Sequence, residues 1–137
     1  MIIEEELRAA LKAMTAVTTI VGDRIWDEWF RSETIPAIVF EIDIESPQND
    51  ISGRGGLVFA EVNVICRAAT RAASRTLAEA VRTNGSISPG SGLAGYTGDF
   101  DAVLEDMQAA AVPKNEGSNA YWYDTNMSFR ISWTEAI

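Results

Sequence analysis

Apolar residues recur at helical spacing near the start of the chain. They stand three or four positions apart at Ile3, Leu7, Ala10, Leu11 and Met14. The three glutamates at positions 4–6 fall in the first turn of this segment, where the helix dipole favours negative charge. The pattern predicts an amphipathic helix of about three turns.

A second segment with helical spacing follows Thr70, whose hydroxyl suits the N-cap position. Its apolar side is formed by Ala73, Leu77, Ala80 and Val81. We expect this helix to end at Asn84-Gly85, because both residue types tolerate the left-handed conformation that closes many helices.

Alternation of apolar and polar residues predicts four strands. They run from Ala37 to Glu45, from Leu57 to Arg67, roughly from Phe100 to Ala109, and from Tyr121 to Trp133. The last of these alternates most strictly, so its register should be firmly set. Alternation also places Cys66 and Trp133 on the apolar faces of their strands, where we expect both side chains to be buried.

The remaining segments are expected to be irregular. They are Val17 to Ile25, a surface loop with two aromatic anchors from Asp27 to Ile35, a flexible connection from Asn84 to Asp99, and two long hairpin loops at Ser46 to Gly56 and Val112 to Ala120. The two hairpin loops should project beyond the sheet, a position that suits contacts with other subunits.

The elements follow one another in the order helix, strand, strand, helix, strand, strand. This order predicts an α+β fold, in which an antiparallel four-stranded sheet carries both helices on one face. The 137 residues are enough for one hydrophobic core, so we expect residues 1–137 to form a single domain.

The charge balance disfavours two kinds of partner. Lysine and arginine together number 11 against 20 aspartates and glutamates, which gives a net charge of -9. Such a chain is repelled by free nucleic acid and by anionic membranes. The acidic N-terminus does not resemble a signal peptide, and no segment approaches the ~18 apolar residues of a membrane span, so we expect a cytoplasmic protein.

The residue types also disfavour most enzyme chemistry. The chain has no histidine and a single cysteine, which excludes disulfides, histidine-ligated or cysteine-cluster metal sites, Ser-His-Asp triads and Cys-His pairs. Two acidic groups remain as candidates for a metal site or an acid/base pair: Glu41, Asp43 and Glu45, and Asp99, Asp101, Glu105 and Asp106. We interpret the first group as a solvated strand face, and the second lacks the spacing and the glycine of a calcium-binding loop. The glycines at positions 53, 55 and 56 match no nucleotide-binding motif, so we expect neither metal nor cofactor.

Interface candidates come from three features of the sequence. Two tryptophans lie on polar surfaces, two arginines belong to a positive stripe that begins at Arg67 and continues to Arg82, and four polar residues stand in the hairpin loops. In that order, the candidates are Trp29 and Trp122, Arg71 and Arg75, and Asn49, Arg54, Lys114 and Glu116. Two alternatives remain open, because the tryptophans can cover their own core and the arginines can pair with neighbouring acids or with an acidic face of another copy.

Six short segments occur in a characteristic order along nearly the whole chain. They are Leu7 to Ala13, the turn Val21-Gly22-Asp23-Arg24-Ile25, Pro36 to Phe40, Val64 to Ala68, Ala72 to Arg82, and Ser128 to Trp133. In this order they resemble the tail completion proteins (tail terminators, or tail-to-head joining proteins) of long-tailed bacteriophages, prophages and gene-transfer particles. The Gly-Asp-Arg turn is the most specific segment, and we expect Arg24 to brace it by pairing with a carboxylate.

The resemblance implies a structural virion protein without catalytic residues. Proteins of that family form a homo-hexameric ring that caps the head-proximal end of the tail tube, stops its polymerisation and contacts the head-tail connector or stopper protein. The protein would then be found in the virion tail, and DNA would pass through an acidic lumen without specific binding. Three alternatives are another neck or head-completion component, a ferredoxin-like ligand-binding module that dimerises through its sheet or helix face, and a metal-dependent enzyme that uses the acidic groups.

Overall fold

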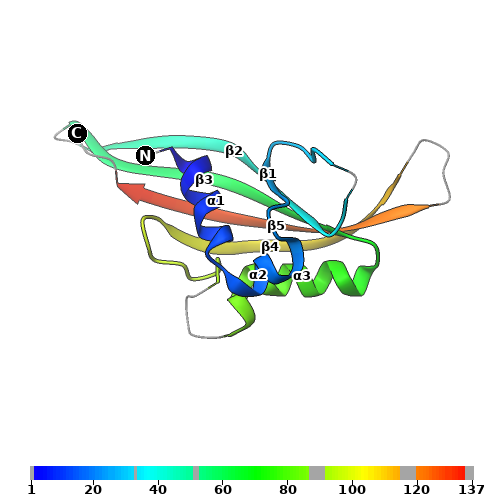
Figure 1. The fold of residues 1–137 in the computed structure, drawn as a ribbon. Coiled ribbons are helices and arrows are strands. Elements are labelled where there is room, and N and C mark those ends of the chain that lie inside the picture. The colour runs from blue at the N-terminus through cyan, green and yellow to red at the C-terminus, as the bar shows by residue number, and fades with distance from the viewer. Residues whose placement is uncertain (1, 33, 51–52, 87–91, 115–119, 135–137) are drawn as a thin grey trace.

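A mixed sheet with helices on one face forms the described part of the chain in the computed structural model, which covers residues 2–32, 34–50, 53–86, 92–114 and 120–134 (Figure 1). The elements in chain order are α1 (Ile3–Lys12), α2 (Thr15–Val21), β1 (Ile25–Asp27), β2 (Ala37–Asp50), β3 (Gly53–Ala68), α3 (Arg71–Thr83), a short 3-10 turn (Asn84–Ser86), β4 (Asp101–Pro113) and β5 (Tyr121–Thr134).

The sheet has five strands in the order β1-β2-β3-β5-β4. β1 runs parallel to β2, and every other neighbouring pair is antiparallel. The prediction of an α+β fold is confirmed, whereas the four-stranded antiparallel sheet and the α-β-β-α-β-β order are wrong in detail. β1 was missed because a strand of three residues is too short to show alternation.

A third helix, α2, occupies the segment that we expected to be irregular. Every residue of this helix except Ala16 is threonine, valine or isoleucine, and such β-branched residues are poor helix formers. The hydroxyls of Thr18 and Thr19 both donate to the carbonyl of Thr15, so these hydrogen bonds are made within the helix itself. The helix ends at Gly22, whose φ of 60° is accessible to glycine at little cost.

The first predicted hairpin loop is largely strand, and the second is strand only at its start. In the first, β2 and β3 continue to pair as far as Asn49 with Arg54 and Asp50 with Gly53, so Ser46 to Gly56 is mostly an extension of the sheet. In the second, β4 continues to Pro113, and the N–H of Lys114 donates to the carbonyl of Ala120. The tips at residues 51–52 and 115–119 lie outside the described residues, and the turn-forming residues near them did not stop the backbone pairing on either side. The two arms project from opposite ends of the sheet (Figure 1).

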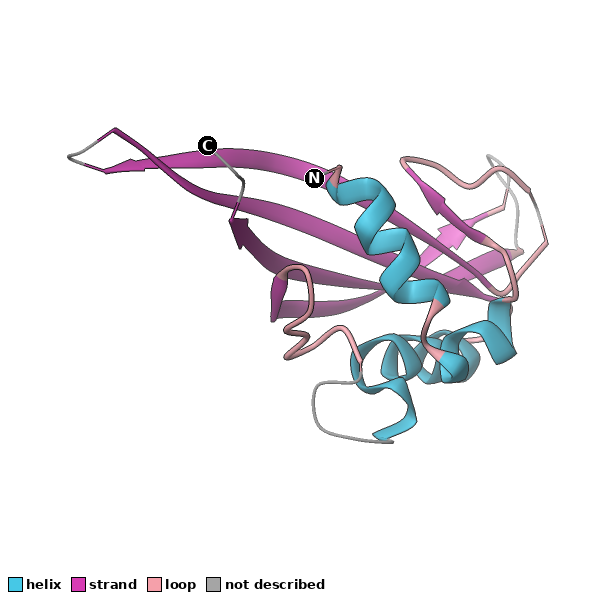
Figure 2. Cartoon of the chain, turned by 60° about the vertical axis from the view of Figure 1, so that its left-hand side comes forward, coloured by secondary structure: helices cyan, strands magenta, loops and turns pink. Residues whose placement is uncertain are grey.

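The hydrophobic core lies between the three helices and one face of the sheet (Figure 2). All five apolar residues of the predicted first helix are buried, as are Cys66 and Trp133. The other face carries no helix and is mostly polar. A bulge in β2 between Ile42 and Ile44 shifts the register, so Glu45 pairs with Ala60 and does not continue the alternation that we expected after Glu41 and Asp43.

Helix α3 begins and ends as predicted. The hydroxyl of Thr70 accepts a hydrogen bond from the N–H of Ala73, and Asn84 closes the helix in the left-handed conformation. The side chain of Asn84 also accepts from the N–H of Ala16, which ties α3 to α2. Part of the connection that we expected to be flexible packs closely, because Leu93 is fully buried and its N–H donates to a carbonyl at the end of α3.

Candidate assembly surfaces

An arginine lies between two aromatic rings at the end of the sheet that carries the β4–β5 arm. The guanidinium of Arg67, near the end of β3, is 4.2 Å from the ring centre of Phe30 and 4.5 Å from that of Trp122. Phe30 comes from the segment after β1, and Trp122 lies near the start of β5. We call these three residues with Asp124 the arginine cluster.

Asp124 fixes the orientation of this guanidinium. Its two carboxylate oxygens accept hydrogen bonds of 2.8 and 2.9 Å from Arg67, a bidentate geometry that only arginine offers. Both side chains are largely buried, at 14% and 6% exposed. The guanidinium is therefore held by a carboxylate and lies within contact distance of two aromatic rings.

A shallow groove lies over the arginine cluster, lined by Phe30, Arg31, Ser32, Arg67 and Trp122. Trp29 stands beside it and is 60% exposed, an unusual position for so large an apolar side chain. Arg31 lies 5.4 Å from the ring centre of Trp29 and forms an ion pair of 3.0 Å with Asp27. The groove thus offers aromatic surface and cationic groups together, a composition common at protein interfaces.

The structure gathers only part of the predicted interface set at this end of the sheet. Trp122 belongs to the arginine cluster and Trp29 stands beside it, while Arg71 lies 5.7 Å from the ring of Tyr123, the neighbour of Trp122. Lys114 is exposed at the end of the β4–β5 arm. Asn49 and Arg54 pair in the opposite arm, and Glu116 lies outside the described residues.

The expected positive stripe is partly paired with acids of the same chain. Arg75 and Arg82 both contact the carboxylate of Glu79, at 3.3 and 2.6 Å, and Arg67 belongs to β3 and pairs with Asp124. The alternative of local pairing is therefore confirmed for these three arginines. The sequence analysis missed Phe30 as a partner of Arg67, and no pattern within one segment of the sequence pointed to the contact of Arg67 with Asp124.

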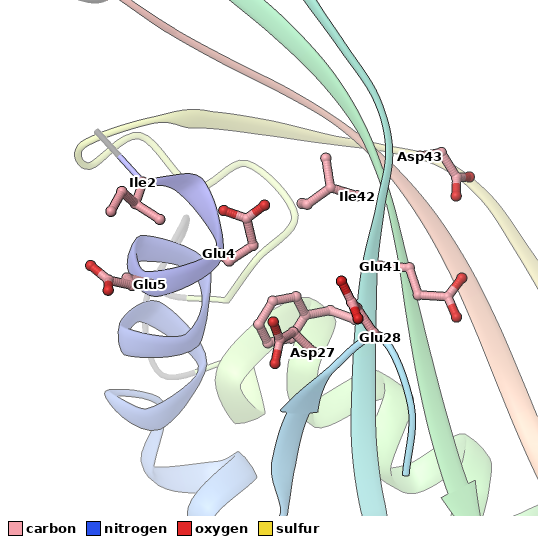
Figure 3. A pocket seen from close by; sticks show the side chains of 9 residues that line it. Ile2, Glu4, Glu5, Asp27, Glu28, Glu41, Ile42 and Asp43 are labelled. Atoms are coloured by element: carbon pink, nitrogen blue, oxygen red, sulfur yellow. The ribbon is translucent and has the colours of Figure 1, made fainter.

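Acidic side chains line a cleft between α1, β1 and β2. The cleft has a volume of about 550 Å³ and includes the apolar residues Ile2, Phe40 and Ile42. Its carboxylates are Glu4, Glu5, Asp27, Glu28, Glu41 and Asp43. Figure 3 shows that they do not converge, since Glu41 and Asp43 point away from α1 beyond β2 and Glu5 points outward. Among the described residues, no group of acids or cysteines is arranged to hold a metal ion.

The open face of the sheet holds a polar network. The side chain of Asn63 donates to Asp43 and accepts from the hydroxyl of Ser128. Nearby, a hydrogen bond between Glu61 and Glu105 raises the pKa of Glu61, as do partial burial and the Glu105 charge, while Arg130 opposes the shift. A proton shared between the two carboxyl groups lowers their repulsion, so Glu61 takes up its proton at a higher pH than an ordinary glutamate.

The single thiol is enclosed by the core. Cys66 is fully buried, and this burial raises the pKa of the thiol far above its ordinary value, with a smaller contribution from the charge of Asp124. The carbonyl of the same residue accepts a hydrogen bond of 2.8 Å from the hydroxyl of Ser74. Burial and the raised pKa of the thiol give Cys66 a packing role rather than that of a nucleophile.

Arg24 braces the Gly-Asp-Arg turn, but through carbonyl groups and not through the carboxylate that we expected. Its Nε donates to the carbonyl of Pro36 at 2.9 Å, and a terminal nitrogen lies 3.5 Å from the carbonyl of Ile20. The arginine joins the end of α2 to the start of β2, where the sequence leaves carbonyl groups without other partners.

Comparison with known families agrees with this architecture. The family model for "Tail completion protein gp17" matches residues 5–84, which include most of α1, every element from α2 to the end of α3, and more than half of the chain. The chain belongs to the tail completion protein gp17 family. It is therefore a structural protein of the phage tail.

A solved structure and the curated proteins complete the comparison. A chain in the "Virion of native gene transfer agent (GTA) particle" is similar, with 18% sequence identity and a TM-score of 0.49 over 92% of this chain and 94% of that chain. No curated protein matches. Within its described residues, this tail completion protein has no helix of the length and apolarity needed to span a bilayer.

Proposed function

We propose that this tail completion protein forms a homo-hexameric ring at the head-proximal end of a phage tail tube, where it terminates polymerisation and joins the tail to the head connector. The observation that carries the proposal is the family match over residues 5–84. The protein acts by binding, without catalysis, and its site of action is the virion tail after assembly in the host cytoplasm.

The two hairpin arms support this function. They project from opposite ends of one sheet, as shown in Figure 1, so a single rigid domain can reach two different partners. The β4–β5 arm lies at the same end as the arginine cluster, where aromatic side chains line the groove. We assign one arm to the tail tube or a neighbouring subunit and the other to the connector or stopper protein.

Charge and residue chemistry support the remaining parts of the proposal. With a net charge of -9, a ring of such chains is suited to let DNA pass through its lumen without lasting phosphate contacts. The chain has no histidine, and its one thiol is buried, so its residues favour a binding role over catalysis. Mapping the charge of an assembled ring tests whether its lumen is acidic, and a strongly basic lining would contradict the proposal that DNA passes without lasting contacts.

The test of this function uses purified tail-tube protein and connector. We expect the protein to bind one end of preformed tubes, to stop their elongation when it is added during polymerisation, and to appear as a six-fold ring by electron microscopy. Binding to the connector without binding to tube ends would instead favour another neck component. Failure to bind either partner would contradict the proposal.

A further inference from the structure

The outer edge of β4 is a second candidate contact that the proposed ring does not explain. β4 is the last strand of the sheet and pairs only with β5 (Figure 1). At its start this edge is covered, because Ala102 accepts from the N–H of Gly95 and donates to the carbonyl of Tyr96. The described structure places no strand against the rest of β4.

The hydrogen bond at the end of the arm shows which backbone groups point to the free edge. The N–H of Lys114 donates to Ala120, its direct partner, so Lys114 belongs to the hydrogen-bonded positions of the β4–β5 pair. Hydrogen-bonded and outward-facing positions alternate in an antiparallel ladder. The N–H and C=O groups of Met107, Ala109 and Ala111 therefore face away from β5.

This part of the edge lacks the usual protection against strand pairing. Residues 107–112 carry no charge, and two of their small side chains, Ala109 and Ala111, are exposed. Edge strands are normally protected by lysine, by proline or by inward-pointing charge. Here the bulge between Leu104 and Asp106 precedes residues 107–112 and Pro113 follows them. Bulges and prolines both hinder strand pairing, so residues 107–112 form the unprotected part of the edge.

We propose that the free edge of β4 pairs antiparallel with the same edge of a second copy of this chain, about a two-fold axis at Ala110. In this register Asp106 lies opposite Lys114 of the second copy, and the symmetry gives this opposite-charge pair twice. Between them, Gln108 faces Val112 and Ala110 faces itself on the open face, so no like charges meet. Registers shifted by two residues place Asp106 opposite Val112 or opposite position 116, a glutamate, so neither gives an opposite-charge pair and charge complementarity selects this one.

The contact differs in kind from the ring contact. A two-fold interface is closed once two copies have joined, so it cannot propagate around six subunits. It forms a dimer of the free protein and covers the exposed edge before the protein reaches a tail. Asp106 also accepts a hydrogen bond of 2.9 Å from Gln108 of its own strand, which holds the carboxylate on the open face.

Charge reversal tests the register on the full chain, by sedimentation velocity over a range of concentrations. We expect a monomer–dimer equilibrium in which Asp106→Lys or Lys114→Asp alone raises the dissociation constant by about tenfold or more, because each places like charges opposite one another twice. The double variant should restore the dissociation constant to near that of the parent. A strictly monomeric parent, unaffected single variants or failure of the double variant to rescue would overturn the proposal.

Two further variants distinguish loss of the edge contact from a general effect of charge or of misfolding on dimerisation. Asp101→Lys makes the same charge change on the same strand, near the part of the edge already covered by the chain, so it should leave the dissociation constant unchanged. Ala109→Pro removes an outward-facing N–H but no hydrogen bond to β5, and should abolish the dimer while circular dichroism retains the parent spectrum. Dimerisation that survives Ala109→Pro in a folded protein would place the contact elsewhere and overturn the proposal.

Discussion

Arg67 and Asp124 are direct partners across β3 and β5, and their side chains meet through two hydrogen bonds of 2.8 and 2.9 Å. The guanidinium also lies 4.2 Å from the ring centre of Phe30 and 4.5 Å from that of Trp122. The pair thus joins three parts of the chain that are distant in sequence. It supports the groove surface on which Trp29 and Trp122 are presented.

Removing the charge of Asp124 should destabilise the fold. In Asp124→Asn the guanidinium of Arg67 stays enclosed between aromatic rings without a counter-charge, and an uncompensated buried charge is costly. Because the pair keeps slight solvent exposure, we expect a loss of about 2–4 kcal/mol in the free energy of unfolding. Urea denaturation followed by circular dichroism measures this change.

The matched control is Arg75→Gln, which breaks the ion pair between Arg75 and Glu79 on the surface of α3. The Arg75 side chain is 62% exposed, so solvent already screens the interaction. We expect a change of at most about 0.5 kcal/mol. Equal losses for the two variants would show that the arginine cluster has no special role in stability.

The acid pair on the open face should make stability depend on pH. The pKa of Glu61 is raised in the folded protein, so the folded chain binds more protons than the unfolded chain above pH 4.5. The extra proton binding by Glu61 stabilises the folded chain. This stabilisation is fully present below the pKa of Glu61 in the unfolded chain, and it is lost as the pH rises through the raised pKa of Glu61 in the folded chain. Glu61→Gln keeps an uncharged hydrogen-bonding partner for Glu105 and removes the repulsion at neutral pH.

We therefore expect Glu61→Gln to be more stable than the parent at pH 7, by about 0.2–1 kcal/mol. The difference should shrink as the pH falls through the raised pKa of Glu61, because the Glu61 carboxyl then carries a proton and no longer repels Glu105. Urea titrations at several pH values test this trend, and Glu105→Gln should reproduce it. A variant less stable than the parent at pH 7 would contradict the pairing.

The thiol of Cys66 should be inert while the protein is folded. The side chain is fully buried and the pKa is raised, so both access and thiolate formation are suppressed. We expect a thiol reagent at pH 8 to react at least roughly a hundredfold more slowly with the native protein than with the protein in urea, because reaction requires unfolding. Rapid stoichiometric labelling without denaturant would refute this assignment.

Local patterns predicted the elements whose signals lie within a few residues. The first helix and α3 were predicted because their apolar spacing, the Thr70 cap and the Asn84 end are all local features. By contrast, α2 and β1 are short, and α2 consists mainly of β-branched residues, so neither gives a clear periodic signal. The hairpin arms were taken for loops because glycine and proline indicate turns, although backbone pairing tolerates them near strand ends.

The candidate surfaces were harder to predict because they depend on register between distant strands. Exposure of Trp29 follows from its polar neighbourhood in the sequence, and it is confirmed. The contact of Arg67 with Phe30 and Asp124 requires knowing that the ends of β3 and β5 pair and that the segment after β1 folds over them. No spacing within one segment encodes that arrangement.

Truncating the side chain of Trp29 should weaken the capping of tail tubes without lowering the stability of the fold. The side chain is 60% exposed, so Trp29→Ala should change the free energy of unfolding by less than about 0.5 kcal/mol. If this tryptophan is an anchor for a tail partner or a neighbouring subunit, its loss should weaken capping of tail tubes by about thirtyfold, the effect typical of an interface hot spot. Val103→Ala is the matched control, because Val103 is equally exposed but lies on the open face of β4, and it should leave capping unchanged. Capping is measured from tube lengths in electron micrographs over a range of protein concentrations. Parent-like capping by Trp29→Ala would remove this surface from the interface.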